Sequence, residues 1–206
     1  MFGIEQYRRP HGDEGRECIQ SMYSEHLPSM ERTLELIPEM EPSQILDIGC
    51  GGGMCINLLL KRYPDAMGHG VDISEECIEA SFDYNKGYID AGRAEFRLGE
   101  VSHLPYPDDM FDIVMATSTY FFWPDLRNDI KEISRTMRKG AVLLISGGAD
   151  RPDTESLKPE ARKEVDGMNI PTHDQMLSYY DDAGLDGELF ILEGDFPWVV
   201  YRGVKR

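Results

Sequence analysis

A cluster of glycines follows a short apolar run in the segment Asp47-Ile48-Gly49-Cys50-Gly51-Gly52-Gly53. Glycines at a turn between a strand and a helix let the backbone approach a ligand, and the first N–H groups of the helix are free to bind it. A dinucleotide-binding fingerprint would need glycine at position 54, where this chain has Met54. The Asp47 carboxylate would repel a pyrophosphate but suits an ammonium group. The segment therefore favours S-adenosylmethionine over a nicotinamide dinucleotide.

Two further acids follow the next two predicted strands. Asp72 lies about 20 residues after the glycine cluster, where a carboxylate can accept hydrogen bonds from both hydroxyls of a ribose. Ile73 beside it is expected to pack on the adenine. Glu100, followed by Val101, is placed to accept a hydrogen bond from the adenine amino group. Three acids at consecutive strand ends occur by chance much less often than one, so together they predict an adenosine site.

The residues at the end of the fourth predicted strand, from Ala116 and Thr117 onward, would face the methyl group and its acceptor. Methyl transfer from a sulfonium is an in-line displacement, which a protein assists by aligning the nucleophile and excluding water. Aromatic faces also attract the positive sulfonium. We therefore expect Tyr120 and Trp123 to line the acceptor pocket, whereas the two phenylalanines between them are more typical of the core.

A general base is needed only if the nucleophile arrives protonated. His26 and Tyr23, on a predicted N-terminal helix, are the candidates, although a histidine at such a place more often lies on the helix surface. The segment after the fourth strand lacks the Asn/Asp-Pro-Pro-Tyr/Phe pattern expected of an enzyme that methylates nucleic-acid amino groups. It also lacks a convincing cluster of metal ligands. We expect a small-molecule acceptor and no metal.

Alternating strands and helices would position these residues, which is typical of βαβ units in a parallel sheet. The predicted strands are 44–48, 67–71, 95–98, 111–116, 141–145, 188–193 and 198–204. The last two, joined through Gly194-Asp195-Phe196-Pro197, are too close in sequence for a crossover helix and must be antiparallel.

The predicted helices follow the first, second, fourth and fifth strands. The second begins at Ser74 as its N-cap and buries Ile78, Phe82 and Ile89. The helix after the fourth strand carries Met137 on its buried face and ends at Lys139-Gly140. The helix after the fifth strand is expected near 174–183.

Residues 1–42 are predicted to form an N-terminal helical extension or lid, and residues 43–206 the core domain. Within the extension, 10–15 is expected to be a turn or loop. Leu27, Met30, Leu34 and Ile37 give the helix that follows an apolar face.

The charge of the chain limits its partners. Its 206 residues carry 21 Lys+Arg and 38 Asp+Glu, a net charge of −17, which disfavours nucleic acid and anionic lipid. Apolar runs are far shorter than the ~20 residues of a membrane span, and the first residues lack a secretory pattern, so we expect a cytoplasmic protein without stable membrane insertion. The four cysteines form no C-x-x-C pair and are expected to be free thiols. The sequence leaves monomer and homodimer open.

Five segments, 45–53, 70–74, 99–106, 111–114 and 138–143, resemble in order the motifs of class I S-adenosylmethionine-dependent methyltransferases. The closest group is the small-molecule enzymes similar to ubiquinone and menaquinone biosynthesis methyltransferases. The resemblance implies a Rossmann-like α/β fold with a seven-stranded sheet of order 3-2-1-4-5-7-6, strand 7 antiparallel, and flanking helices. It also implies that the residues matching Asp47, Gly49 and Gly51 hold the methionine part of the cofactor. Glu100 departs from the aspartate that is commoner there.

The full set of predicted cofactor-binding residues is Asp47, Gly49, Cys50, Gly51, Gly53, Asp72, Ile73, Glu100, Val101, Ala116 and Thr117. Two alternatives to a methyltransferase remain. One is an NAD(P)-dependent oxidoreductase, suggested by the pair Tyr201 and Lys205. On a helix these residues would share a face, but on the predicted strand they are roughly 13 Å apart. The other is a non-catalytic accessory protein that binds S-adenosylmethionine.

Overall fold

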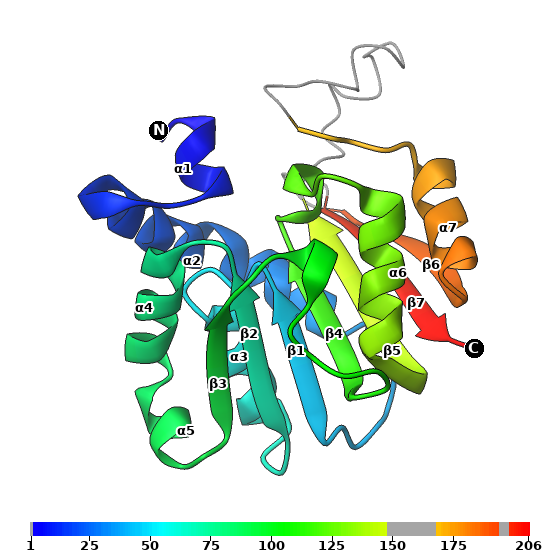
Figure 1. Cartoon of the computed structure of the whole chain (residues 1–206), viewed down its shortest axis with the longest axis horizontal. Helices are drawn as coiled ribbons and strands as arrows, with labels where there is room; N and C mark the ends of the chain where they lie inside the picture. Colours follow the sequence, from blue (N-terminus) through cyan, green and yellow to red (C-terminus); the bar gives the residue numbers. More distant parts are fainter. Residues whose placement is uncertain (1, 148–167, 194–197) are drawn as a thin grey trace.

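A mixed sheet of seven strands in the order β3-β2-β1-β4-β5-β7-β6 runs through the centre of the molecule (Figure 1). The computed structural model describes residues 2–147, 168–193 and 198–206. The strands are β1 (Gln44–Ile48), β2 (Met67–Asp72), β3 (Ala94–Leu98), β4 (Phe111–Thr117), β5 (Met137–Gly147), β6 (Leu185–Leu192) and β7 (Trp198–Lys205). Strands β1 to β5 are parallel, and β7 pairs antiparallel with β5 and β6. The predicted topology is confirmed. The predicted connection 194–197 lies outside the described residues.

Helices cover both faces of this sheet. They are α1 (Ile4–Arg8), α2 (Gly12–Leu34), α3 (Met54–Arg62), α4 (Glu75–Tyr84), α5 (Lys86–Asp90), α6 (Leu126–Thr136) and α7 (His173–Asp182), with short 3-10 turns η1 (Val101–His103) and η2 (Tyr120–Phe122). Neighbouring residues of one strand face opposite layers. Ile45 of β1 belongs to the core that includes α3, and Leu46 to the core that includes α6 and α7. Burial on both faces explains why the central strand β4 and the second half of β5 are almost continuously apolar.

Helix α4 begins at its predicted N-cap, but its predicted apolar face is confirmed only in part, since Ile78 and Ile89 are partly buried against the core and Phe82 is not. The Ser74 hydroxyl accepts a hydrogen bond from the Cys77 amide, which caps the helix. Phe82 is 43% exposed, whereas the buried residues of α4 are Cys77 and Ser81. The helix also ends before Ile89, which lies on the separate helix α5. Small and polar residues take the buried face because this side of α4 lies against the glycine loop and binds its backbone.

The helix after β4 is shorter than predicted, because α6 ends at Thr136 and Met137 begins β5. The register between β4 and β5 shifts at the start of the pair. Gly140, with φ +79, lies in this irregular part of the strand instead of capping the helix. Asp112 on β4 accepts a hydrogen bond from Nη1 of Arg138 at 2.7 Å, which fixes the extra residues against the neighbouring strand.

The N-terminal extension is more helical than the sequence suggested. Residues 12–15, expected to be part of a loop, form the first turn of α2, so the break between α1 and α2 is confined to positions 9–11. Met30 and Leu34 of the predicted apolar face are buried, and both belong to the core that includes α3. This packing holds α2 beside the glycine loop.

Candidate functional site

A cavity of about 350 Å³ lies at the carboxyl ends of β1 to β4, and residues of α1 and α2 form part of its wall. Ligands of open α/β sheets bind at this edge, and the volume falls within the roughly 300–1,000 Å³ of small-molecule sites. Most of the residues predicted from the sequence line it: His26, Asp47, Gly49, Cys50, Gly51, Asp72, Ile73, Glu100, Val101, Thr117 and Trp123. The fold therefore brings together residues that are spread over nearly 100 positions of the sequence.

The glycine loop turns sharply between β1 and α3. Gly49, Gly51 and Gly53 have φ values of +68, +53 and +79, a backbone region that other residues rarely adopt. The amides of Gly49 and Cys50 both donate to the carbonyl of Val71 on β2, at 2.8 and 3.1 Å. These bonds tie the loop to the neighbouring strand end, so its shape is fixed by the sheet.

Side chains from α2, from α4 and from Asn85, which directly follows α4, hold three carbonyl groups of this loop. The Ser81 hydroxyl donates to Gly51 O at 2.8 Å, the Asn85 amide to Gly53 O at 3.0 Å, and the Tyr23 hydroxyl to Gly52 O at 2.8 Å. These contacts are beyond what the sequence pattern predicted. The sequence did contain a signal for these contacts, because one face of α4 carries small and polar residues. The prediction of an apolar face for this helix overlooked that signal.

Tyr23 approaches the loop so closely that only glycine fits beneath it. A Cβ on Gly52 would lie 1.8 Å from the Tyr23 hydroxyl oxygen. The Tyr23 ring also packs on Tyr84 of α4, with ring centroids 5.0 Å apart. Helix α2 therefore covers the glycine loop through a direct contact.

Asp72 at the end of β2 is buried and hydrogen-bonded on both oxygens. Its Oδ2 accepts from the Gly51 amide and its Oδ1 from the Ser74 amide, each at 2.9 Å. Burial raises the pKa of this carboxyl, and the two amides act in the opposite direction because they stabilise the charged form. The carboxylate is thus aligned by the backbone on either side of it.

Asp47 at the end of β1 is only 2% exposed, and its carboxylate accepts no hydrogen bond from any described residue. Burial, and then the nearby charge of Asp72, raise the pKa of Asp47 well above its usual range. A buried carboxylate without a partner is costly, so it marks a position where a cationic or hydrogen-bond-donating ligand would be stabilised.

The far side of the cavity combines two apolar side chains with an exposed acid. Ile73 is 38% exposed and Val101 is buried, and both line the cavity. The Glu100 side chain is largely exposed and lies 3.8 Å from Nδ1 of His103. These residues form an open, mainly apolar edge next to Asp72.

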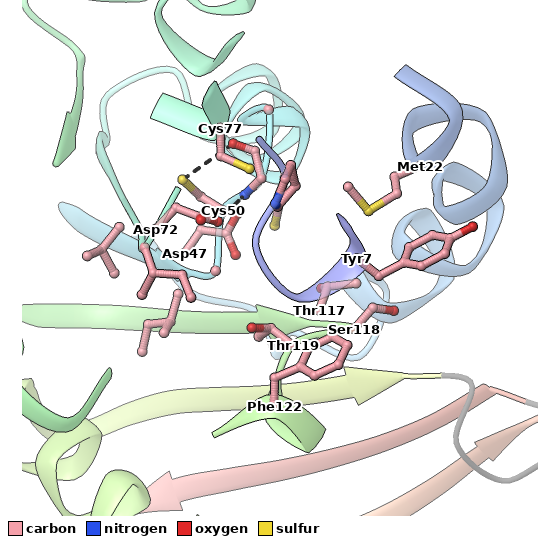
Figure 2. Close-up of a pocket in the computed structure, with 18 of the residues that line it drawn as sticks. Tyr7, Met22, Asp47, Cys50, Asp72, Cys77, Thr117, Ser118, Thr119 and Phe122 are labelled. Atoms are coloured by element: carbon pink, nitrogen blue, oxygen red, sulfur yellow. Dashed lines mark hydrogen bonds between the residues drawn. The ribbon is translucent and has the colours of Figure 1, made fainter. Parts of the chain in front are cut away.

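Thr117, Ser118 and Thr119 at the end of β4, together with Phe122, form the opposite side of the cavity. Figure 2 shows these four residues on the same side as Tyr7 and Met22, apart from the group formed by Asp47, Asp72, Cys50 and Cys77. The cavity therefore has an acidic part and a part with aromatic, thioether and hydroxyl side chains.

Three predicted site residues do not line the cavity. Tyr120, expected to border the acceptor, is only 1% exposed and packs in the core against Phe121 and Tyr201. Ala116 is fully buried within β4. Gly53 lies against Asn85 and not against the cavity. A Cβ added to Gly53 would lie 2.5 Å from the Asn85 amide nitrogen. The turn η2 rotates Tyr120 under the sheet edge and leaves Trp123 at the cavity.

His26 on α2 lines the cavity, and its ring lies 5.9 Å from that of Trp198. Its ring nitrogens make no hydrogen bond with the described residues. Burial lowers the pKa of His26, with Glu25 acting in the opposite direction. A neutral imidazole next to a ligand cavity is able to accept a proton.

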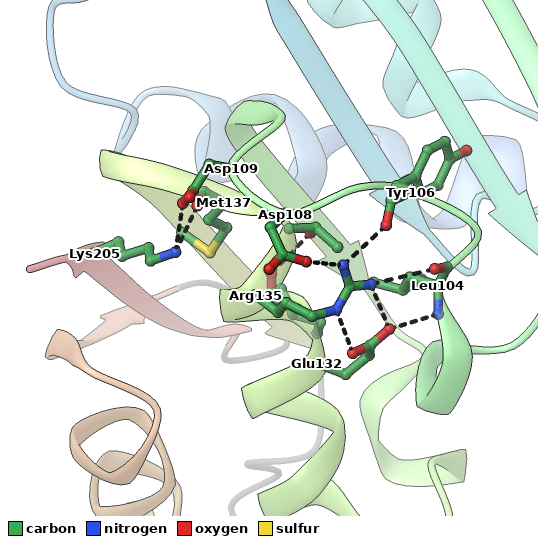
Figure 3. Close-up of polar contacts among 10 residues, drawn as sticks. Leu104, Tyr106, Asp108, Asp109, Glu132, Arg135, Met137 and Lys205 are labelled. Carbon is green, nitrogen blue, oxygen red and sulfur yellow. Dashed lines mark hydrogen bonds and ion pairs between the residues drawn. The ribbon is translucent and has the colours of Figure 1, made fainter.

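The loop that follows β3 and forms one wall of the cavity is fastened to α6 by Arg135 (Figure 3). The guanidinium donates to Asp108 Oδ1 at 2.6 Å and to Glu132 Oε1 at 2.7 Å, and Glu132 Oε1 also accepts from the Leu104 amide at 2.9 Å. The hydrogen bond from Arg135 is the main reason why the pKa of Glu132 is lowered. The network fixes the wall that carries Val101.

The pair that suggested an oxidoreductase is not assembled. Tyr201 and Lys205 both lie on β7, and the Lys205 ammonium donates to Asp109 Oδ1 at 3.0 Å and to the carbonyl of Met137 at 2.7 Å. The Tyr201 hydroxyl bonds instead with Nδ1 of His173 at 2.7 Å. Neither residue lines the cavity.

The four cysteines, Cys18, Cys50, Cys55 and Cys77, are buried free thiols, as predicted. Within the described residues, no group of histidine, cysteine, aspartate and glutamate is arranged to hold a metal ion. Among those residues there is also no helix with the length and apolar character of a membrane span.

Residues 46–145 match the family described as a methyltransferase domain. Ajmaline N-methyltransferase of Rauvolfia serpentina is 31% identical over 61% of this chain and 44% of its own length. The 27-O-demethylrifamycin SV methyltransferase of Amycolatopsis mediterranei is 29% identical over 77% of this chain and 59% of its own length. The chain thus spans about half the length of these curated relatives.

Among solved structures, the geranyl diphosphate C-methyltransferase of Streptomyces coelicolor, in complex with Mg²⁺, geranyl diphosphate and S-adenosyl-L-homocysteine, superposes with a TM-score of 0.75. It is 13% identical, and the match covers 96% of this chain and 86% of that one. At this identity the likeness concerns the fold. The relatives include both N- and O-methyltransferases, so the finer resemblance to quinone-biosynthesis enzymes stays a prediction.

Proposed function

The chain belongs to the class I S-adenosylmethionine-dependent methyltransferases, and we propose that it binds S-adenosylmethionine in the cavity and transfers its methyl group to a small molecule. The observation that carries the proposal is the unpartnered, buried carboxylate of Asp47 beside a glycine loop, with Asp72 at the next strand end. This arrangement has a place for an ammonium group and for ribose hydroxyls in one cavity.

The residues present fit this cofactor. Asp47 would accept hydrogen bonds from the ammonium group and so gain the partner that it lacks within the described chain. Asp72 uses one acceptor position on each oxygen for the amides of Gly51 and Ser74, and a carboxylate has about four such positions in all. Hydrogen bonds from the Cys77 thiol and the Ile73 amide also lower the pKa of Asp72, and the ribose hydroxyls would join these donors at the same carboxylate. Ile73 and Val101 would pack on the adenine, and Glu100 would accept from its amino group.

When bound, S-adenosylmethionine supplies an electrophilic methyl group on a positively charged sulfur. The part of this chain that follows β4 would align the acceptor, and helices α1 and α2 would exclude water from it. For a hydroxyl acceptor, a ring nitrogen of His26 would take the proton, because burial favours the neutral imidazole. Trp123 would border the acceptor. Tyr120 is left out of this proposal, because it is enclosed in the core.

Isothermal titration calorimetry tests the proposal directly. We expect saturable heats with S-adenosylmethionine and S-adenosylhomocysteine, and none with NAD⁺ or NADP⁺ under the same conditions. Tight binding of either nicotinamide cofactor, with no response to S-adenosylmethionine, would refute it and restore the oxidoreductase alternative.

A second measurement separates an enzyme from a binding-only accessory protein. The protein is incubated with cell metabolite extract and methyl-labelled S-adenosylmethionine, and the products are analysed by mass spectrometry. A labelled product that depends on the protein is expected. Binding of the cofactor without any labelled product would favour the accessory role.

A further inference from the structure

The order of the strands divides the cavity into two compartments. The cofactor compartment (Asp47, the glycine loop 49–53 and Asp72) lies at the ends of β1 and β2. The acceptor compartment (Tyr7, Met22, His26, Ser118, Thr119 and Phe122) lies beyond β1, at the end of β4 and beneath α1 and α2. Since β1 lies between β2 and β4 in the sheet, a ligand whose ribose lies at Asp72 and whose ammonium group lies at Asp47 extends toward the acceptor compartment.

The walls of the acceptor compartment are apolar or uncharged. They present the aromatic rings of Tyr7 and Phe122, the thioether of Met22, and two hydroxyl groups (Figure 2). Among the described residues that line the cavity, Arg8 is the only lysine or arginine, and it is exposed. The acids Asp47 and Asp72 are close by, and the whole chain carries −17. An anionic acceptor would therefore be repelled without a buried cation to balance it.

Ser118 is the unusual residue of this compartment, because its φ of +54 is a strained value for a residue with a side chain. Its amide donates to the carbonyl of Ser146 on β5 at 2.8 Å, which holds the backbone in this conformation. Among the described residues, the other one with a side chain and positive φ is Asp109, a residue type that adopts this region more readily. Strain of this kind persists where the surrounding structure enforces it, commonly at ligand sites.

The Ser118 hydroxyl also has no hydrogen-bond partner among the described residues. Neither this hydroxyl nor that of Thr119 makes a hydrogen bond with a described residue, although both side chains are partly buried and line the cavity. Thr119 is close to the glycine loop, since its Oγ1 would lie 2.4 Å from a Cβ on Gly49. Ser118 has no such neighbour in the loop and lies on the side of Tyr7 and Met22 (Figure 2).

We propose that Ser118 binds the nucleophilic oxygen of the acceptor, and that the acceptor is an uncharged, mainly apolar molecule with a hydroxyl group. This proposal rests on the proposed methyl transfer. In the reaction, the acceptor oxygen forms a bond to the methyl carbon, and the carbon–sulfur bond breaks with its electron pair left on the now neutral sulfur. The hydroxyl proton passes to a ring nitrogen of His26. Ser118 orients the oxygen that attacks, whereas His26 takes its proton.

Binding of three matched probes to the protein loaded with S-adenosylhomocysteine tests the acceptor class. The probes are para-propylphenol, its analogue without the hydroxyl, propylbenzene, and its anionic analogue, para-hydroxyphenylpropionate. Titration by ligand-observed NMR is expected to show para-propylphenol bound roughly tenfold more tightly than either analogue. Equal or tighter binding of the anionic probe, or no saturable binding of para-propylphenol, would overturn the proposal.

Two substitutions separate a hydroxyl that binds the acceptor from a residue that only shapes the backbone. Ser118→Ala removes the hydroxyl and keeps the strain, whereas Ser118→Gly removes both. We expect each variant to bind para-propylphenol roughly 2- to 10-fold more weakly, with the affinity for S-adenosylhomocysteine unchanged. If Ser118→Gly binds para-propylphenol as tightly as the wild type, the hydroxyl does not contribute to binding and only the backbone conformation at this position does. That result would overturn the assignment of Ser118 as a residue that binds the acceptor.

Ser24→Ala is the matched control, because the Ser24 hydroxyl is exposed and donates to the carbonyl of Ser21 on the same helix. It should leave probe binding unchanged. The failure of the two proposals is distinguishable: a wild-type protein that does not bind S-adenosylhomocysteine refutes the methyltransferase proposal, whereas one that binds it but ignores para-propylphenol refutes only the acceptor assignment.

Discussion

The cofactor compartment consists of backbone and acids at consecutive strand ends, whereas the acceptor compartment consists of side chains from segments far apart in sequence. In the first, the carbonyls of Gly51, Gly52 and Gly53 and both oxygens of Asp72 have partners within the described chain, whereas the Asp47 carboxylate lacks one there. In the second, the imidazole of His26 and the hydroxyl of Ser118 have none among those residues. The protein itself therefore holds most of the backbone of the cofactor compartment and leaves the Asp47 carboxylate for the ligand, whereas the polar side chains of the acceptor compartment are mostly left for the ligand.

The two compartments should therefore respond differently to substitution. Changes in the cofactor compartment should act on cofactor affinity, and changes in the acceptor compartment on turnover. The contact between Tyr23 and the glycine loop joins the two, because it links helix α2 to the cofactor-binding backbone.

The largest effect is expected from Asp72→Ala. Loss of two charge-assisted hydrogen bonds, at about 1.5–3 kcal/mol each, should weaken S-adenosylmethionine binding roughly 10²- to 10⁴-fold. Calorimetry measures this change, and thermal unfolding checks that the variant still folds. The exposed Asp65→Ala is the control. Unchanged affinity in Asp72→Ala would show that the ribose lies elsewhere.

His26→Gln should lower turnover of a hydroxyl acceptor by about 10²-fold, because a general base contributes at least this much. The affinity for the cofactor should stay the same, since His26 lies outside the cofactor compartment. Steady-state rates with the acceptor from the metabolite screen, together with calorimetry, measure both quantities. Equal losses in turnover and cofactor affinity would break the distinction between the compartments.

Asp47→Asn should weaken S-adenosylmethionine binding about tenfold, through loss of a charge-assisted hydrogen bond to the ammonium group. The same change should alter the pH dependence of stability. The pKa of Asp47 is raised in the folded protein, so its contribution to stability is present below the unfolded pKa of about 4 and is lost as pH rises through the folded pKa.

Urea unfolding of the ligand-free protein at a series of pH values measures this contribution. The free energy of unfolding should fall less steeply with rising pH in Asp47→Asn than in the wild type, while Asp65→Asn should follow the wild type. Identical slopes for Asp47→Asn and the wild type would mean that Asp47 titrates normally in the folded state.

The smallest effect is expected from Tyr23→Phe, which removes the hydrogen bond to Gly52 O and keeps the aromatic packing on Tyr84. A neutral hydrogen bond contributes about 0.5–1.5 kcal/mol, so the cofactor affinity should fall roughly 2- to 10-fold. Calorimetry measures it. A larger loss would mean that α2 organises the loop, and no loss would mean that the loop is held by the sheet and α4 alone.

Much of the fold was predictable because apolar runs, glycines and caps act locally. The positions of the strands, the antiparallel pairing of the last two and the N-cap at Ser74 followed from such signals, whereas the strand order was implied by the resemblance to the methyltransferase family. The errors occurred where tertiary contacts prevailed. Met137 fits the apolar spacing of the preceding helix, but in the structure it is the first residue of β5. Phe82 is exposed because the buried face of α4 lies against the glycine loop.

The sequence by itself determined the cofactor compartment, because a parallel sheet places consecutive strand ends at one edge. Asp47, the glycine loop and Asp72 were therefore found together without knowledge of distant contacts. Only the tertiary structure decided the acceptor compartment. Which residues of a short turn face a cavity depends on backbone angles such as those at Ser118, and which helix covers the cavity depends on long-range packing. For that reason Tyr120 was assigned to the wrong side of η2, and the backbone conformation of Ser118 and the contact of Tyr23 with the glycine loop were recognised from the structure alone.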